Sequence, residues 1–343
     1  MTDRRGYRAL TFSVIRVNVA VIGMGLIGGS LLRALASAGH WLAGYDTDPS
    51  TRAMARTGAA LAPKESRWLV APSIPDAVSA ADLAVIATPL LAVGSVLDEI
   101  SGAGYTGLVT DVVSVKVPVR RLVARHLRGG GQRLASYVGG HPMAGREIAG
   151  FASADLALFH NCAWALCLDE ETNLSDWLTI ANLLTGLGVR VVPTTSTDHD
   201  RAVAAVSHVP HLLAAALARA IADPLAATLA AGSFRDGTRV AASSPDLIAA
   251  MCGGNAGPVQ EALEAVLTEL DTAGSALEAD DPIAAVRAWA APSNVARTSW
   301  PKGWGDPNHM AVTVEALLDL GDRGGWITNV SADRHTVTAV LPV

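Results

Sequence analysis

The chain has 343 residues and a formal net charge of −6 at neutral pH; 50% of its residues are apolar and only 5% are aromatic. This length suits two domains, and the apolar content is enough for a large core. The mild negative charge argues against nucleic acid or an anionic membrane surface as the main partner.

The cysteines and the uncharged runs indicate a cytoplasmic protein with no metal site and no membrane span. The three cysteines form no Cys-x-x-Cys pair, so neither a disulfide framework nor a zinc site is expected. The charged start at residues 1–5 is not followed by the apolar segment of a secretory signal. The longest uncharged runs, 18–32 and 202–218, fall short of the roughly 20 apolar residues that span a membrane.

Strands alternate with helices in the first half of the chain. Residues 16–23 form a β-branched run that ends in glycine and predicts a buried strand. The pattern further predicts helices at 25–38 and 48–58 and strands at 41–46, 83–87 and 108–111. Such alternation implies right-handed βαβ units, so we expect an α/β fold with a Rossmann-like, doubly wound parallel sheet.

The pattern changes after residue 172. A strand is expected at 189–193, and helical patterns follow at 200–222, 223–231, 245–252 and 258–279. These helices are too apolar for a solvated appendage, so we expect them to pack on one another and on a second subunit, as a homodimer.

The end of the chain predicts a short extension. Residues 292–307 have the composition of a loop, and a helix at 309–319 and strands at 326–330 and 336–341 follow. We therefore divide the chain into a Rossmann-like domain at 1–172, an all-helical dimerisation domain at 173–285 and a carboxyl-terminal extension at 286–343.

Residues 23–28 read Gly-Met-Gly-Leu-Ile-Gly, which fits the G-x-G-x-x-G pattern between a strand and a helix. Asp46 ends the next strand, 18 residues after the last glycine, where a carboxylate binds adenosine ribose hydroxyls and repels a 2′-phosphate. This context predicts a dinucleotide site that favours NAD over NADP. The residues expected to hold the cofactor here are Gly23, Gly25, Leu26, Ile27, Gly28 and Asp46.

Two further segments end predicted strands at the edge where ligands bind in open α/β sheets. Thr88 and Pro89 follow the strand at 83–87, and we expect both near the cofactor, although Thr-Pro is also an ordinary strand terminator. Ser114 follows the strand at 108–111 and would reach the nicotinamide end of the crevice; helix capping by Ser114 is an equal alternative from spacing alone.

His141 lies in the run Gly-Gly-His-Pro-Met-Ala-Gly at 139–145, so it belongs to a loop or an element end. A histidine titrates near neutral pH, and on a rigid loop beside an oxidant it can accept the proton that accompanies hydride transfer. The alternative from the pattern alone is a buried, hydrogen-bonded histidine in a turn.

Two polar groups interrupt the apolar helical part. His208 and His211 are three residues apart, so a helix places them on one face, and Pro210 predicts a kink or a later helix start. Arg235 and Arg239 are suited to bidentate binding of a carboxylate, or to pairing with a nearby aspartate.

Five segments together resemble the prephenate/arogenate dehydrogenase family of tyrosine biosynthesis. They are 23–30 (GMGLIGGS), 110–116 (TDVVSVK), 139–150 (GGHPMAGREIAG), 199–211 (HDRAVAAVSHVPH) and 234–241 (FRDGTRVA), with Asn255 beyond them. They occur in family order over about residues 16–280, and the tail after about residue 285 has no part in the resemblance.

The resemblance implies a role for each matching residue. His141 would be the catalytic base, and Ser114 would hydrogen-bond His141 or the reacting hydroxyl. Arg239 would bind a substrate carboxylate, and His208 and His211 would be the paired pocket histidines, with His211 the favoured substrate contact. The chain departs from the family at Val113, where glycine is usual, and at Ile248, where tryptophan is frequent.

The implied reaction is the NAD-dependent oxidative decarboxylation of prephenate to 4-hydroxyphenylpyruvate. Arogenate is the nearest alternative substrate, since no motif marks the side-chain contacts. A β-hydroxyacid dehydrogenase would use a lysine as acid and base, which makes Lys116 the residue to exclude. A non-catalytic NAD-binding homologue would need neither His141 nor Arg239, and both are present.

Overall fold

The computed structural model describes residues 16–127, 136–145 and 148–343. The charged start, for which we expect no secretory signal, and residues 146–147 of the histidine segment lie outside the described residues.

The first sheet has the predicted Rossmann-like architecture. Its six strands are all parallel, in the order β3-β2-β1-β4-β5-β6. The strands are β1 (Asn18–Ile22), β2 (Trp41–Tyr45), β3 (Leu69–Val70), β4 (Leu83–Ile86), β5 (Leu108–Asp111) and β6 (Ser136–Val138). The connecting helices are α1 (Leu26–Ser37), α2 (Pro49–Leu61), α3 (Ile74–Val78), α4 (Val93–Gly102) and α5 (Val117–His126). The strand order reverses between β1 and β4, which is where such sheets bind nucleotides.

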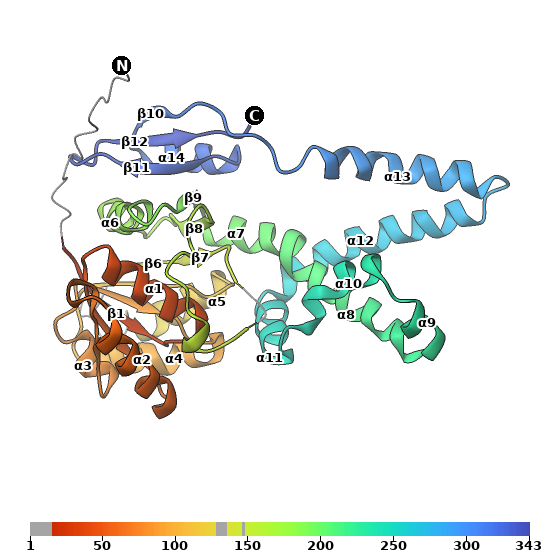
Figure 1. The fold of residues 1–343 in the computed structure, drawn as a ribbon. Helices are drawn as coiled ribbons and strands as arrows, with labels where there is room; N and C mark the ends of the chain where they lie inside the picture. The colour runs from red at the N-terminus through yellow and green to blue at the C-terminus, as the bar shows by residue number, and fades with distance from the viewer. Residues whose placement is uncertain (1–15, 128–135, 146–147) are drawn as a thin grey trace, which may run out of the picture.

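A second six-stranded sheet lies above the first and combines the middle of the chain with its tail (Figure 1). Its order is β10-β12-β11-β9-β8-β7, and only β8 and β9 are parallel. The middle of the chain supplies β7 (Gly140–Pro142), β8 (Ala163–Cys167), α6 (Leu174–Thr185) and β9 (Arg190–Thr194). The tail supplies β10 (Asn308–Ala311), α14 (Val314–Asp322), β11 (Trp326–Val330) and β12 (Thr336–Val340).

This second sheet changes the expected organisation. Residues 173–193, which we expected in the helical part, contribute α6 and β9 to it. The two tail strands form where predicted, but the helix expected at 309–319 runs from Val314 to Asp322. Residues 308–311 form a strand instead, because they pair with β12.

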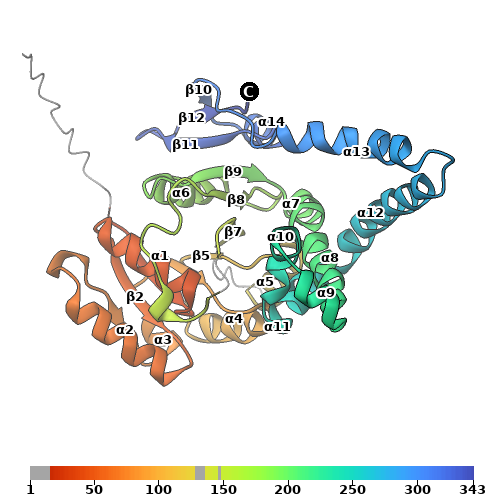
Figure 2. The ribbon, with the colours of Figure 1, turned by 45° about the vertical axis from the view of Figure 1, so that its right-hand side comes forward.

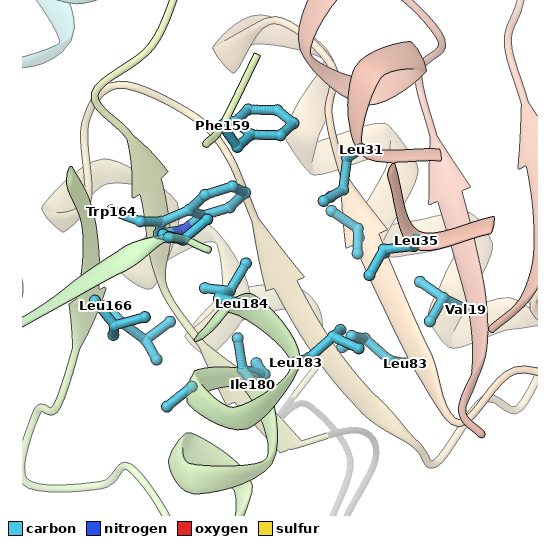
Figure 3. Close-up of a cluster of buried hydrophobic side chains, with 14 of the residues drawn as sticks. Val19, Leu31, Leu35, Leu83, Phe159, Trp164, Leu166, Ile180, Leu183 and Leu184 are labelled. Carbon is cyan, nitrogen blue, oxygen red and sulfur yellow. The ribbon is translucent and has the colours of Figure 1, made fainter. Parts of the chain in front are cut away.

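The two sheets share one hydrophobic core. Figure 3 shows Val19, Leu31 and Leu35 of the first sheet and its helices facing Trp164 and Leu184 of the second. Side chains of the tail, including Leu317, Ile327 and Val337, belong to the same buried cluster. The tail is therefore built into the scaffold that carries the site.

Residues 196–298 form the predicted all-helical part. Its main helices are α7 (Ser196–Val203), α8 (Val209–Ala218), α12 (Ala256–Leu277) and α13 (Pro282–Thr298). A π-helical turn, η4 (Ala204–His208), joins α7 to α8, so α8 begins beside Pro210. Shorter helices between them are η5 (Arg219–Ala222), α9 (Pro224–Leu229), α10 (Gly232–Thr238), η6 (Arg239–Ala242), α11 (Pro245–Ile248) and η7 (Ala249–Gly253).

α12 and α13 form a long hairpin that extends away from both sheets (Figures 1 and 2). The loop expected at 292–307 is wrong for its first residues, because Pro292 lies inside α13. Proline costs a helix about 3 kcal/mol, and the good helix formers before it, such as Ala290 and Ala291, support the helix against this cost.

The helical run Ser196–Ala222 is 27 residues long and, by length and composition alone, is apolar enough to cross a membrane. Only 22% of its apolar window is buried within one chain. Other helices of this part also expose large apolar side chains, such as Leu267, Leu270 and Ile283. These exposed faces need a covering partner.

Candidate active site

The glycine loop has the geometry of a phosphate-binding turn. Gly23 has φ +97°, and a Cβ there would lie 2.5 Å from the Ala87 carbonyl oxygen. A Cβ on Gly28 would lie 1.9 Å from the Gly23 carbonyl oxygen, so this position needs glycine for close packing. A Cβ on Gly25 would meet nothing within 4 Å, so the space beside Gly25 is open to a ligand.

The start of α1 is suited to an anion. Gly25 is its N-cap and provides no side-chain cap, and the first turn, which includes Leu26 and Ile27, has no acidic residue. The free backbone N–H groups and the helix dipole therefore favour a phosphate here.

Asp46 and Thr88 follow the carboxyl ends of β2 and β4, the two strands that flank β1. Asp46 Oδ2 accepts a hydrogen bond from Met24 N at 2.7 Å, which ties the end of β2 to the glycine loop. The Thr88 hydroxyl is buried and has no hydrogen-bond partner among the described residues, and Pro89 follows it on the surface. A buried polar atom without a partner is rare, so Thr88, like the open space at Gly25, fits a bound dinucleotide.

His141 lies at the centre of β7, directly after the point where the chain passes from the first sheet to the second. It pairs with Ala165 of β8, and its side chain is half-buried. His141 Nδ1 lies 2.8 Å from His199 Nε2. His141 is therefore hydrogen-bonded, but it lies in a strand rather than in a turn, and its partner is a second histidine.

The hydrogen bonds of this pair fix the position of the protons. Asp200 Oδ1 lies 2.8 Å from His199 Nδ1, and the same carboxylate accepts from Lys116 N and Val117 N at 2.8 Å each. Burial by itself would raise the pKa of Asp200. The hydrogen bonds hold this pKa below its ordinary value, and the one from His199 has the largest effect among them. An ionised carboxylate only accepts, so His199 carries its proton on Nδ1 and accepts at Nε2.

His141 must then donate from Nδ1, which leaves Nε2 as its unprotonated nitrogen. Burial lowers the pKa of His141 well below its ordinary value, and the neighbouring charges of His199, Lys116 and His208 lower it further. The Asp200–His199–His141 chain therefore presents a neutral imidazole with its basic nitrogen directed away from His199. A neutral histidine held in one tautomer can act as a general base.

His208 lies beside this chain and is held by Asn255. Asn255 Nδ2 donates to the Asp200 carbonyl at 2.6 Å and lies 3.2 Å from His208 Nδ1. His208 therefore accepts at Nδ1 and carries its proton on Nε2, which is buried without a partner among the described residues. Burial lowers the pKa of His208 to about 4. His208 thus offers a neutral N–H donor, whereas His211 donates from Nδ1 to the Ser207 carbonyl at 2.8 Å.

Ser114 and Arg239 lie on two further elements, one in each part of the chain. Ser114 is half-buried in the loop that follows β5, and no hydrogen bond joins it to His141 in the part of the chain that the structure describes. Arg239 begins η6, which packs against α8, the helix of His211, and its side chain is exposed.

Lys116 does not face the crevice as an acid or base. Its side chain is 0% exposed, forms an ion pair with Asp111, and donates to the Gly140 carbonyl at 2.6 Å. The two positions at which the sequence departs from the resembling pattern lie on different elements. Val113 is buried beside Asp111, and Ile248 is the last residue of α11.

Sequence reasoning missed two members of the site, His199 and Asp200. Both lie near the middle of α7, and His199 is 58 residues after His141 in the chain. The adjacent His-Asp pair within a resembling segment was the one available signal. No cluster of metal-ligating side chains occurs among the described residues.

A parallel sheet with a glycine loop suited to phosphate, together with a neutral histidine held in one tautomer, is the combination expected of a nucleotide-dependent dehydrogenase. Two family models match the chain: that of the prephenate dehydrogenase nucleotide-binding domain over residues 31–193, and that of the prephenate dehydrogenase dimerization domain over residues 195–287. The chain belongs to the prephenate/arogenate dehydrogenase family.

Individual relatives agree with this membership. The prephenate dehydrogenase of Bacillus subtilis is 31% identical over 77% of this chain and 71% of its own length. A solved structure from Corynebacterium glutamicum, provisionally named a prephenate dehydrogenase, has 34% identity and a TM-score of 0.73 over 83% of this chain and 90% of its own. The arogenate dehydrogenase of Synechocystis has 28% identity and a TM-score of 0.69 over 82% and 99%.

Proposed function

We propose that this protein catalyses the NAD-dependent oxidative decarboxylation of prephenate to 4-hydroxyphenylpyruvate and CO2. The observation that carries the proposal is the Asp200–His199–His141 chain, which leaves a neutral nitrogen of His141 available as a base. The prephenate dehydrogenase of Bacillus subtilis, which this chain resembles over 77% of its length, supports the substrate.

The cofactor would lie on the glycine loop. Gly23, Gly25 and Gly28, with Leu26 and Ile27, would hold the pyrophosphate at the start of α1, and Asp46 would bind the adenosine ribose. Thr88, Pro89 and Ser114 would line the crevice toward the nicotinamide. When bound, NAD supplies the hydride acceptor. The carboxylate of Asp46 supports NAD over NADP, because it would repel a 2′-phosphate.

His141 would remove the hydroxyl proton of the substrate. Its Nε2 accepts this proton as the carbon that bears the hydroxyl is oxidised, and His199 holds the ring in the required tautomer. Asp200 stabilises the charge that then develops on the two imidazoles. Loss of CO2 from the ring makes it aromatic, so the products are strongly favoured.

The substrate carboxylates need donors. Arg239 would bind one of them, and the unpartnered Nε2–H of His208 supports a hydrogen bond to the substrate, with His211 beside it. Arogenate is the alternative substrate, supported by the resemblance to the Synechocystis arogenate dehydrogenase.

The working unit would be a cytoplasmic homodimer that binds neither nucleic acid nor membrane. The exposed apolar faces of the helical part, together with its match to a dimerization domain, support burial against a second copy. Cys162, Cys167 and Cys252 are all free, as expected in a reducing compartment.

The direct test measures NADH formation by the wild-type protein with prephenate and with arogenate side by side, and with NAD and NADP. Turnover of prephenate with NAD is the expected result. Preference for arogenate would reassign the substrate, and no turnover of either would contradict the proposal.

A further inference from the structure

A buried charge cluster lies directly behind the strand that carries His141. The side chains of Lys116 and Asp111 are both 0% exposed and form an ion pair. The ammonium also donates to the Gly140 carbonyl at 2.6 Å, and the Tyr137 hydroxyl donates to Asp111 Oδ2 at 2.6 Å. The cluster therefore binds Tyr137 of β6 and Gly140 of β7, one on each side of the passage between the two strands.

The backbone at this passage is crowded by the cluster. A Cβ on Gly140 would lie 2.8 Å from the Asp111 carbonyl oxygen and 2.9 Å from Trp164 Nε1. A Cβ on Gly139 would lie 3.0 Å from the Tyr137 hydroxyl. These close neighbours explain the two glycines before His141, and the cluster binds the Gly140 backbone directly.

A merely structural role would not require charges here. The free energy lost when two charges leave water offsets most of their mutual attraction, and a protein with an apolar pair of similar size is often as stable. β7 is only three residues long and lies at the edge of the second sheet, where β8 is its strand partner. A short edge strand has few hydrogen bonds of its own to fix its position.

We propose that the buried Lys116–Asp111 pair is a positioning unit, which fixes the Gly140 backbone so that His141 meets His199 and holds an ammonium group against the strand of His141. The proposal rests on the proposed function of His141 as the proton acceptor. Lys116 touches neither substrate nor cofactor in this role.

The charges around His141 are consistent with this arrangement. Beyond the effect of burial, the charges that lower its pKa come from His199 on α7, Lys116 before α5 and His208 on η4. At His199, Lys116 lowers the pKa, while Asp200 and Asp111 raise it. Among the described groups that act on His141, Lys116 is the one that is not a histidine.

The test removes both charges together, because Lys116→Met alone would leave a buried carboxylate unpaired. For the Lys116→Met/Asp111→Asn double variant we expect unchanged circular dichroism and NADH affinity. We expect kcat/KM for prephenate to fall about tenfold or more, since a small displacement of the base is costly. The acid limb of the kcat/KM profile should move to higher pH, because the ammonium that lowers the pKa of His141 is gone. Lys302→Met, at an exposed lysine, is the matched control.

A second readout does not depend on turnover. The titration of His141, followed by isotope-edited NMR and assigned with His141→Asn, should move up in the double variant and stay in place in the Lys302→Met control. If the wild-type protein turned over neither substrate, the proposed function would fail. The difference between the His141 titrations of the wild-type protein and the double variant would still show whether the cluster acts on His141.

A double variant with wild-type kcat/KM and an unchanged His141 titration would overturn the inference. If the double variant does not fold, Tyr137→Phe keeps both charges and removes one hydrogen bond of Asp111. This variant should lower kcat/KM about two- to fivefold, with the acid limb in place. Wild-type kcat/KM in Tyr137→Phe would equally count against positioning by the cluster.

Discussion

Replacement of His199 by leucine tests the hydrogen-bonded chain behind the base most directly. The substitution removes the acceptor that lies 2.8 Å from His141 Nδ1 and keeps a side chain of similar volume. His141 Nδ1–H would then be left without its partner in a half-buried site. An unmade hydrogen bond of this kind costs about 1–3 kcal/mol.

This cost applies only to the tautomer that has its lone pair on Nε2, so the ring can escape it by moving the proton to Nε2. The population of the productive tautomer, which carries its proton on Nδ1, would then fall by roughly 5- to 150-fold, since about 1.4 kcal/mol corresponds to a factor of ten. We expect kcat to fall within this range and the KM for NAD to stay unchanged, because the glycine loop lies on other elements.

The assay is the initial rate of NADH formation over a range of pH, with His199→Gln as the matched variant. The glutamine carbonyl can replace Nε2 as an acceptor for His141, so this variant should recover most of kcat. His309→Gln, on the exposed strand β10, controls for loss of a histidine as such. Wild-type kcat in His199→Leu, or equal losses in the leucine and glutamine variants, would refute the tautomer argument.

Further expectations follow from the same site. His141→Asn should lower kcat by about 10²- to 10⁴-fold with little change in NAD affinity; near-normal kcat would rule His141 out as the base. Arg239→Ala should chiefly raise the KM for prephenate, and an unmoved KM would exclude the carboxylate contact. Gly25→Val should abolish NADH binding, measured by fluorescence, without loss of fold, because its side chain would enter open space meant for the pyrophosphate. Since the pKa of His141 is lowered below 6.5, the neutral base should persist as pH falls, and kcat/KM should decline only below that pH.

The first sheet and its glycine loop could be predicted because their signals are local. The β-branched strand β1, the glycine loop and Asp46 lie within about one βαβ unit, and each element forms within a residue or two of the expected position. His141 could be singled out for a similar reason, since the glycines and proline around it exclude a helix interior.

The second sheet could not be predicted in the same way. β7 has only three residues, and β9 pairs with β11 through Val191 and Ile327, more than a hundred residues apart in the chain. Nothing in a short apolar run indicates which distant strand it will meet. The strand expected at 189–193 was therefore correct as an element but gave no sign of its partner.

His199 and Asp200 were missed for a related reason. They lie on a helix, so their neighbours in sequence are not their neighbours in the site. The tautomer of His141 depends on His199 Nε2, and that of His199 depends on the Asp200 carboxylate. Three side chains from two elements thus define one proton position, which the spacing of residues within one segment cannot encode.

The tail contributes to the same positioning from the opposite side of the second sheet. β7 is held by β8, β8 by β9, and β9 by β11 of the tail. A Cβ on Gly321 of α14 would lie 1.8 Å from the Pro193 carbonyl oxygen, so this helix approaches β9 as closely as glycine permits. The match to the dimerization domain ends at residue 287, yet the buried side chains of the tail share the core with Trp164 and Leu166 of β8. Since β8 is the strand partner of His141, the position of His141 depends on packing against a tail whose first strand begins at Asn308.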